Sequence, residues 1–92
     1  MLNQCVLVGR VVTLNNEDNT ITISVSRPYK NSDGVYEFDI INITLFKDSS
    51  QYTDYLKEGD LVGIKGRLQT KDNNVIVVAE KLTFLSSKSN ND

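Results

Sequence analysis

Histidine and tryptophan are absent from the 92-residue sequence, and cysteine, proline and methionine each occur once. Without histidine the chain lacks the usual general base at neutral pH, and Cys5 has no neighbouring base in the sequence to activate its thiol. The carboxylates are scattered through expected turns, so they suggest neither a metal cluster nor a general acid–base pair. We therefore predict a protein that is not an enzyme and that uses no cofactor or metal.

The sequence also lacks the features of secreted and membrane proteins. A single cysteine excludes an internal disulfide and is typical of a reducing compartment. No apolar run is long enough for a transmembrane helix, and residues 1–4 lack the basic and apolar regions of a secretory signal. We therefore expect a cytoplasmic protein without a membrane partner.

Hydrophobic and polar residues alternate along most of the chain, which predicts β-strands rather than helices. We expect strands over residues 2–14, 20–26, 35–46, 61–69 and 75–85. Pro28 should interrupt pairing after the second strand, and residues 71–74, with the sequence KDNN, should form a hairpin turn. Only residues 48–59 have a helical pattern, with Gly59 suited to the C-terminal end of the helix.

Three strands, a helix and two further strands are the element order of the OB-fold. This fold is an all-β, five-stranded Greek-key barrel, here with one short helix between strands 3 and 4. Another five-stranded barrel or a sandwich is the alternative. Residues 1–85 make a single domain, and we expect the polar residues 86–92 to be disordered. Gly9 in the first strand and Gly63 and Gly66 in the fourth mark places where a strand can bend sharply enough to close a barrel.

The third expected strand is apolar on both of its faces. One face belongs in the barrel interior and carries Ile41, Ile43 and Leu45. The opposite face carries aromatic and aliphatic residues where a solvated strand would be polar, namely Tyr36, Phe38, Ile40 and Phe46. An exposed apolar row of this kind marks an interaction surface. The alternative is that a loop or a second subunit covers it.

The formal net charge of −2 argues against a nucleic-acid partner, but the placement of the charges matters more than their sum. Six of the ten basic residues lie within or beside expected strands: Arg10, Arg27, Lys30, Lys65, Arg67 and Lys71. Aromatic rings stack with the bases of a single strand, while lysine and arginine contact its phosphates. Lys65 and Arg67 would share the outer surface of the third strand if the fourth strand lay beside it.

Three segments resemble the bacterial single-stranded DNA-binding proteins, and the similarity runs from Leu2 to about Leu85. They are LNQCVLVGRVV (2–12), SVSRPYKNSDGVYEFDIINITLF (24–46) and YLKEGDLVGIKGRLQT (55–70). The resemblance implies an OB-fold protein without enzymatic activity that coats single-stranded DNA without sequence specificity in replication, recombination or repair. It also implies a homo-oligomer, a tetramer rather than a dimer, that is associated with the nucleoid.

The resemblance places stacking aromatics at Tyr29 and Phe46 and a basic residue at Lys71. Ile40 stands where some members of the family carry another aromatic ring, so we expect Phe38 or Tyr36 to take part. The predicted nucleic-acid site as a whole comprises Arg10, Arg27, Tyr29, Lys30, Tyr36, Phe38, Phe46, Lys65, Arg67 and Lys71.

The chain also departs from the family pattern. It has no tryptophan, and its hairpin after Thr70 is short and carries no aromatic residue. No low-complexity linker with an acidic tip follows Leu85, so we expect a short form that does not recruit replication and repair proteins through a tail. Two alternatives stay open: a PriB-type module that acts mainly through protein interaction in a replication assembly, and an oligosaccharide-binding OB domain.

Overall fold

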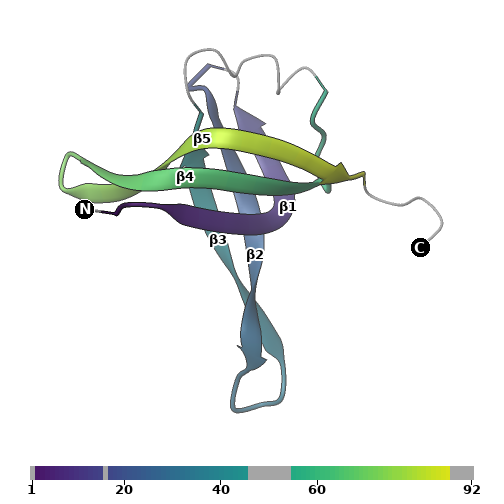
Figure 1. The fold of residues 1–92 in the computed structure, drawn as a ribbon. Coiled ribbons are helices and arrows are strands. Elements are labelled where there is room, and N and C mark those ends of the chain that lie inside the picture. Colours follow the sequence, from purple (N-terminus) through teal and green to yellow (C-terminus); the bar gives the residue numbers. More distant parts are fainter. Residues whose placement is uncertain (1, 16, 46–54, 88–92) are drawn as a thin grey trace.

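Five β-strands make up the part of the chain that the computed structural model describes, which comprises residues 2–15, 17–45 and 55–87. They are β1 (Cys5–Asn15), β2 (Thr20–Lys30), β3 (Tyr36–Thr44), β4 (Leu61–Lys71) and β5 (Asn74–Ser86). They close into a barrel in the order β1-β2-β3-β5-β4 (Figure 1). Strands β3 and β5 pair in parallel, and the other neighbours are antiparallel. The five expected strands are thus confirmed, with β2 longer than expected.

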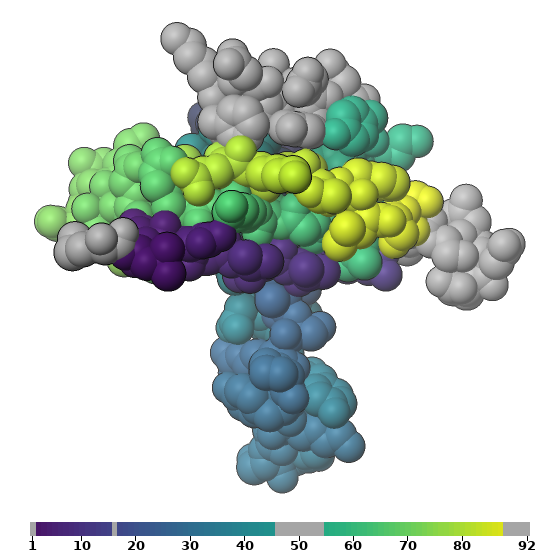
Figure 2. All heavy atoms as spheres, in the orientation of Figure 1, coloured from purple at the N-terminus to yellow at the C-terminus, as the bar shows by residue number. Residues whose placement is uncertain are grey.

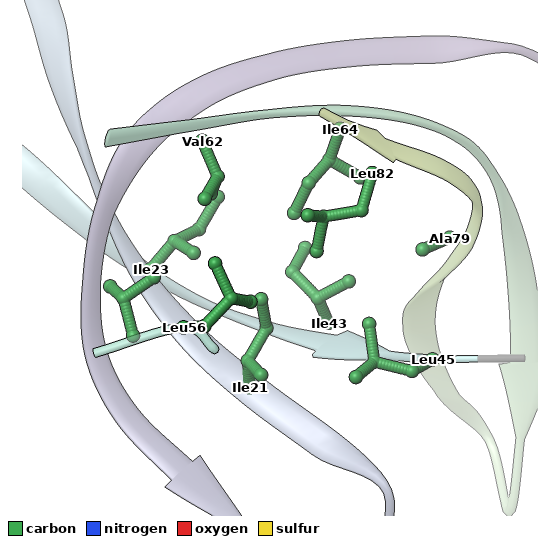
Figure 3. Close-up of a cluster of buried hydrophobic side chains, with 10 residues drawn as sticks. Ile21, Ile23, Ile43, Leu45, Leu56, Val62, Ile64, Ala79 and Leu82 are labelled. Atoms are coloured by element: carbon green, nitrogen blue, oxygen red, sulfur yellow. The ribbon is translucent and has the colours of Figure 1, made fainter. Parts of the chain in front are cut away.

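Alternation along the strands builds the core of the barrel. Ile21 and Ile23 of β2 and Ile43 of β3 point into the barrel and are almost completely buried (Figure 3). Leu45 lies on the same face as Ile43, as expected from the parity of this strand, and Leu56 adds a further buried side chain before β4. Within residues 2–15, 17–45 and 55–87, the buried cluster consists of Val11, Ile21, Ile23, Ile43, Leu45, Leu56, Val62, Ile64, Ala79 and Leu82.

Two glycines allow strands to approach each other closely where the barrel bends. A Cβ atom at Gly9 would lie 2.5 Å from the backbone oxygen of Ser24, and one at Gly66 would overlap the backbone oxygen of Val78. The pairing of β4 with β5 also shifts register between Lys65 and Gly66, which is typical of a β-bulge. Strands therefore approach closely at Gly9 and Gly66, whereas a Cβ atom at Gly63 would meet only the Leu85 side chain, at 3.6 Å, so the structure shows no close approach at the third predicted glycine.

The expected hairpin turn over residues 71–74 is confirmed. Asp72 and Asn73 have φ values of 53° and 68°, the left-handed conformation that a two-residue β-hairpin turn requires. The expected helix over 48–59 falls largely outside the described residues, and its described end, 55–59, forms turns and irregular backbone. In the described part of the chain, no helix is long and apolar enough to cross a membrane.

Strands β2 and β3 continue beyond the barrel as a hairpin, which we call the arm and define as residues 26–40. Figures 1 and 2 show the arm as a narrow projection below the barrel. Its backbone ladder is interrupted, because no pair forms between Ser26–Phe38 and Lys30–Tyr36. Pro28 lies in this gap and has no N–H to donate, so pairing is interrupted there as predicted, but β2 does not end at Pro28 because pairing resumes between Lys30 and Tyr36.

Candidate nucleic-acid interface

One face of the arm carries exposed apolar and aromatic side chains. The cross-strand partners Lys30 and Tyr36, Ser26 and Phe38, and Ser24 and Ile40 lie directly opposite one another. Opposed residues of an antiparallel pair share a face, and residues two apart along a strand do so as well. We call this surface the aromatic face and define it by Ser24, Ser26, Lys30, Tyr36, Phe38 and Ile40.

Two serines on β2 leave the large side chains opposite them on β3 exposed. Phe38 is 60% exposed and Ile40 is 54% exposed, because each lies opposite a serine that is too short to cover it. Near the tip, Lys30 Nζ lies 5.6 Å from the centre of the Tyr36 ring, within the range of a cation–π contact. The face therefore combines open rings with a neighbouring positive charge.

Arg10 extends this surface onto β1. It lies opposite Ser24, which in turn lies opposite Ile40, so the three residues form a row across three strands. With strands about 4.8 Å apart, the backbones of Arg10 and Ile40 are roughly 10 Å from each other. The Arg10 guanidinium donates to the Gly59 carbonyl oxygen at 3.1 Å, and Arg10 forms no ion pair within the described part of the chain.

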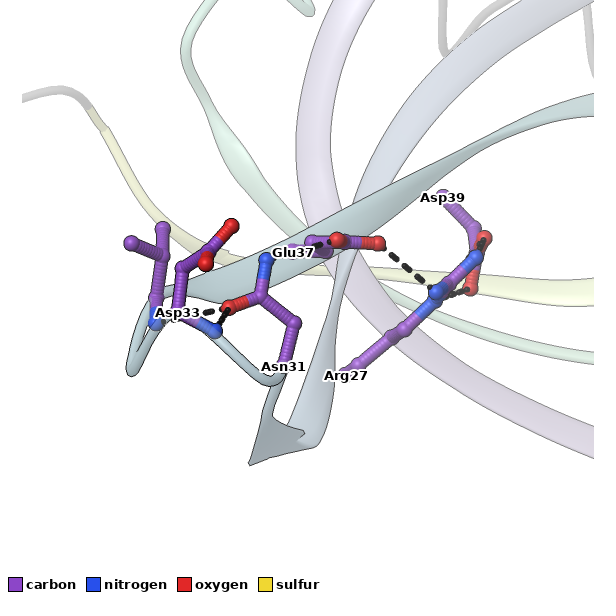
Figure 4. A network of polar contacts seen from close by, with 6 residues as sticks. Arg27, Asn31, Asp33, Glu37 and Asp39 are labelled. Atoms are coloured by element: carbon purple, nitrogen blue, oxygen red, sulfur yellow. Dashed lines mark hydrogen bonds and ion pairs between the residues drawn. The ribbon is translucent and has the colours of Figure 1, made fainter.

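Arg27 points to the opposite side of the arm, where it contacts two carboxylates. Its Nη2 donates to Asp39 Oδ1 at 2.8 Å, and its Nη1 donates to Glu37 Oε2 at 2.9 Å (Figure 4). The hydrogen bond with Asp39 raises the pKa of Arg27 and lowers the pKa of Asp39. We call the surface formed by Arg27, Glu37 and Asp39 the ionic face.

The predicted cations of β4 lie elsewhere on the molecule. Strand β4 is bonded to β1 and β5 and not to β3, so the condition under which Lys65 and Arg67 would extend the third strand's surface is not met. Arg67 forms an ion pair with Glu80 at 3.4 Å, while Lys65 lies opposite both Val6 and Lys81. Lys71 is exposed beside the β4–β5 turn.

The structure thus brings together part of the predicted site. It gathers Lys30, Tyr36 and Phe38 on one face and adds Arg10. Tyr29 is exposed in the interrupted stretch of β2, where the register gives it no partner on β3. Phe46 lies outside the described residues.

The partners of Arg27 were missed by sequence reasoning. Glu37 and Asp39 alternate in step with Ile41 and Ile43, so the sequence alone could have placed all four side chains on one face of the strand. What the sequence did not show was that β2 continues past Pro28, and only this continuation places Arg27 beside them. Arg27 was therefore predicted as a phosphate contact without its acidic neighbours being considered.

A second apolar surface lies on the outside of β1, β4 and β5. Val6 is 69% exposed and Val8 is 50% exposed, and both line a shallow groove of about 270 Å³ together with Leu85. Lys65 and Lys81 lie at the same groove. We call this surface the outer groove. It is built on β1, β4 and β5, whereas the aromatic face is built on β2 and β3.

A model described as the single-strand binding protein family matches residues 2–83. This chain belongs to that family. It is 38% identical to single-stranded DNA-binding protein 2 of Staphylococcus aureus strain COL, in a comparison that covers 99% of this chain and 78% of the relative. It is 37% identical to the single-stranded DNA-binding protein of Halalkalibacterium halodurans, with 96% of this chain and 63% of the relative covered.

Solved structures of single-stranded DNA-binding proteins have the same fold. The mitochondrial protein Rim1 of Saccharomyces cerevisiae superposes with a TM-score of 0.70 at 18% identity, covering 97% of this chain and 99% of Rim1. The Plasmodium falciparum SSB, solved in complex with single-stranded DNA, gives a TM-score of 0.69 at 19% identity and covers 94% and 96% of the two chains. The predicted OB-fold is therefore confirmed.

Membership also bears on the prediction that the protein is not an enzyme. The single-strand binding family is a family of non-enzymatic DNA-binding proteins, so that prediction is confirmed. Among the described residues, no group of three or more histidine, cysteine or acidic side chains is arranged to hold a metal ion.

Proposed function

We propose that this protein binds single-stranded DNA without sequence preference, through base stacking on the aromatic face and phosphate contacts by Lys30 and Arg10. The observation that carries the proposal is the open row of Tyr36, Phe38 and Ile40 on a projecting arm of a single-strand binding family member. Such binding would coat DNA during replication, recombination or repair, in a protein located in the cytoplasm with the nucleoid.

The physical basis is the match between a flat ring and an unpaired base. Every base has two apolar faces, and stacking on an aromatic side chain contributes about 1–3 kcal/mol per base regardless of sequence. Phe38 already exposes most of its ring in the free protein, so no rearrangement is needed to make it available. Lys30 and Arg10 flank the row and supply the charge that follows the phosphates.

Assembly into a homotetramer is part of the proposal. The outer groove exposes Val6 and Val8, and apolar surface of this kind is stabilised by contact with another subunit. A chain of 92 residues buries only about 60–65% of its unfolded surface, so association adds useful stability. Sedimentation of Val8→Asp beside the unaltered protein tests this, and an unchanged mass would exclude the outer groove as the contact.

The function is tested by fluorescence anisotropy of labelled oligo(dT) over a series of salt concentrations. We expect binding that weakens with salt, and Phe38→Ala should lose about 1–3 kcal/mol of binding free energy. Phe84→Ala is the matched control, because Phe84 is 43% exposed on β5, a strand that carries no residue of the aromatic face. Equal losses in the two variants would contradict stacking on the arm.

The same experiment separates the alternatives. An oligosaccharide-binding domain would bind oligo(dT) weakly, and its ligand affinity would be insensitive to salt. A module that acts mainly through protein interaction would show no oligo(dT) binding even at low salt. In that case the exposed Tyr36, Phe38 and Ile40 would mark a surface for a protein partner.

A further inference from the structure

The inward face of β2 and β3 changes character where the two strands leave the barrel. Inside the barrel this face carries Ile23 and Ile43, which are buried against the core. Farther out, the same parity places Arg27, Glu37 and Asp39 there, and the arm has no core to cover them. Where β2 and β3 extend beyond the barrel, an ionic contact therefore takes the place of apolar packing on this face.

The ionic contact lies where the backbone ladder is missing. Between the pairs Ser26–Phe38 and Lys30–Tyr36, three residues of β2 lie opposite one residue of β3, and no regular pair joins them. Arg27 lies in this gap and reaches two acceptors on β3: its Nε and Nη2 bond to Asp39 and its Nη1 bonds to Glu37. Side-chain bonds thus join the strands beside the stretch where the regular backbone pairing is interrupted.

The contacts continue to the tip of the arm. Glu37 accepts a second hydrogen bond on Oε1 from Asn31 Nδ2, at 2.8 Å. Asn31 Oδ1 in turn accepts from the backbone N–H groups of Asp33 and Val35, at 2.9 and 3.0 Å (Figure 4). One chain of hydrogen bonds therefore runs from Asp39 in β3, through Arg27 in β2, to the turn at the tip.

The same contacts make Arg27 a poor phosphate ligand. Its Nε, Nη1 and Nη2 atoms each donate to a carboxylate, so three of the five N–H donors of the guanidinium are already used. One arginine between two carboxylates also gives the ionic face a formal charge of −1, which repels a phosphate backbone. Lys30, on the aromatic face, forms no ion pair among the described residues and keeps its charge available.

We propose that Arg27 is a positioning residue that orders the arm, and that it does not contact phosphate. The expected effect of Arg27 on DNA binding rests on the proposed function. Its expected effect on the order of the arm in the free protein does not. An ordered arm holds Tyr36, Phe38 and Lys30 in place before DNA binds. The binding free energy is then not reduced by the conformational entropy lost when the arm becomes ordered.

The test compares Arg27→Gln, Arg27→Lys and Lys30→Gln with the unaltered protein, using oligo(dT) anisotropy against salt. Arg27→Gln should weaken binding about threefold to tenfold at every salt concentration, because the arm must be ordered on binding. The slope of log affinity against log salt should change by much less than about 0.7, because no phosphate contact is lost. Lys30→Gln should reduce that slope by about 0.7, the value for one lost phosphate contact on a single strand.

A second readout uses the free proteins. ¹⁵N relaxation of the backbone amides of residues 31–35 should show increased fast motion in Arg27→Gln and not in Lys30→Gln. Arg27→Lys keeps the charge but loses the forked geometry, so it should fail to restore the order of the arm. A purely phosphate-binding Arg27 would leave these amides unchanged in all three variants.

The outcomes separate the two proposals. A slope reduced by about 0.7 in Arg27→Gln, with an unaltered free arm, would overturn the inference and make Arg27 a phosphate ligand. If the unaltered protein bound no oligo(dT), the proposed function would fail. Relaxation of the free arm would then still support or overturn the positioning role.

Discussion

The barrel and the arm share strands β2 and β3 but depend on different interactions. In the barrel, Ile23 and Ile43 are 0% exposed, and removal of their side chains from water stabilises the fold. In the arm, the same face carries half-buried Arg27 and exposed Asp39, joined by charge-assisted hydrogen bonds. Exposed ion pairs contribute about 0–1 kcal/mol, far less than a buried isoleucine.

This contrast explains how one small domain can expose so much apolar surface. The closed barrel supplies the stability, and the arm contributes little to it, so the arm's residues are available for binding. Changes in the barrel should therefore alter the free energy of unfolding, and changes in the arm should alter binding with little effect on unfolding.

The largest effect is expected from Ile43→Ala. Ile43 is completely buried, so the change removes apolar contacts and leaves a cavity, with an expected loss of about 2–5 kcal/mol in the free energy of unfolding. Chemical denaturation at fixed protein concentration measures this loss.

Ile40→Ala is the matched control for that experiment. Ile40 lies three residues earlier in β3 and is 54% exposed, so its truncation should change the free energy of unfolding by no more than about 0.5 kcal/mol. A similar loss in both variants would show that the arm is packed as tightly as the barrel and would remove the distinction between them.

An intermediate effect is expected where β4 meets β5. Gly66→Ala would place a methyl group against the Val78 carbonyl, and the required shift should lower the free energy of unfolding by about 1–3 kcal/mol. In Gly63→Ala the new methyl group would meet only the Leu85 side chain, at an ordinary contact distance of 3.6 Å, so this variant should stay near the stability of the unaltered protein. Equal stability of both variants would contradict the close approach at Gly66.

The barrel was largely predictable from sequence, because its signals are local. The alternation of Ile21, Ile23 and Val25 predicted a half-buried strand, and the turn at Asp72 and Asn73 was evident from residue types that tolerate positive φ. The interior face of β3 was also predicted correctly, from the parity of Ile41, Ile43 and Leu45.

The candidate site was less predictable, because it depends on pairing between distant segments. Local patterns do not reveal which strands lie side by side, so Lys65 was considered as a neighbour of the third strand although β4 pairs with β1 and β5. The contact of Arg27 with Asp39 likewise depends on the register of β2 against β3 beyond Pro28. Side-chain parity was visible in the sequence, but the partner across the strand was not.

The smallest effect concerns the titration of Asp39. The hydrogen bond from Arg27 lowers the pKa of Asp39. The stabilisation from this contact is therefore fully present at a pH above the ordinary pKa of 3.8, and it is lost as the pH falls through the lowered pKa of the folded protein. Arg27→Gln removes the charged donor, and the pKa of Asp39 should rise toward 3.8.

Carboxyl ¹³C NMR of Asp39 across an acid titration measures this change. Lys30→Gln is the control, because Lys30 lies on the aromatic face and should leave the titration of Asp39 unaltered. The barrel carries none of these groups in its core, so its amide signals should be the same in both variants at neutral pH. If Asp39 titrated identically with and without Arg27, the ionic face would not be formed in solution, and the arm would need another source of order.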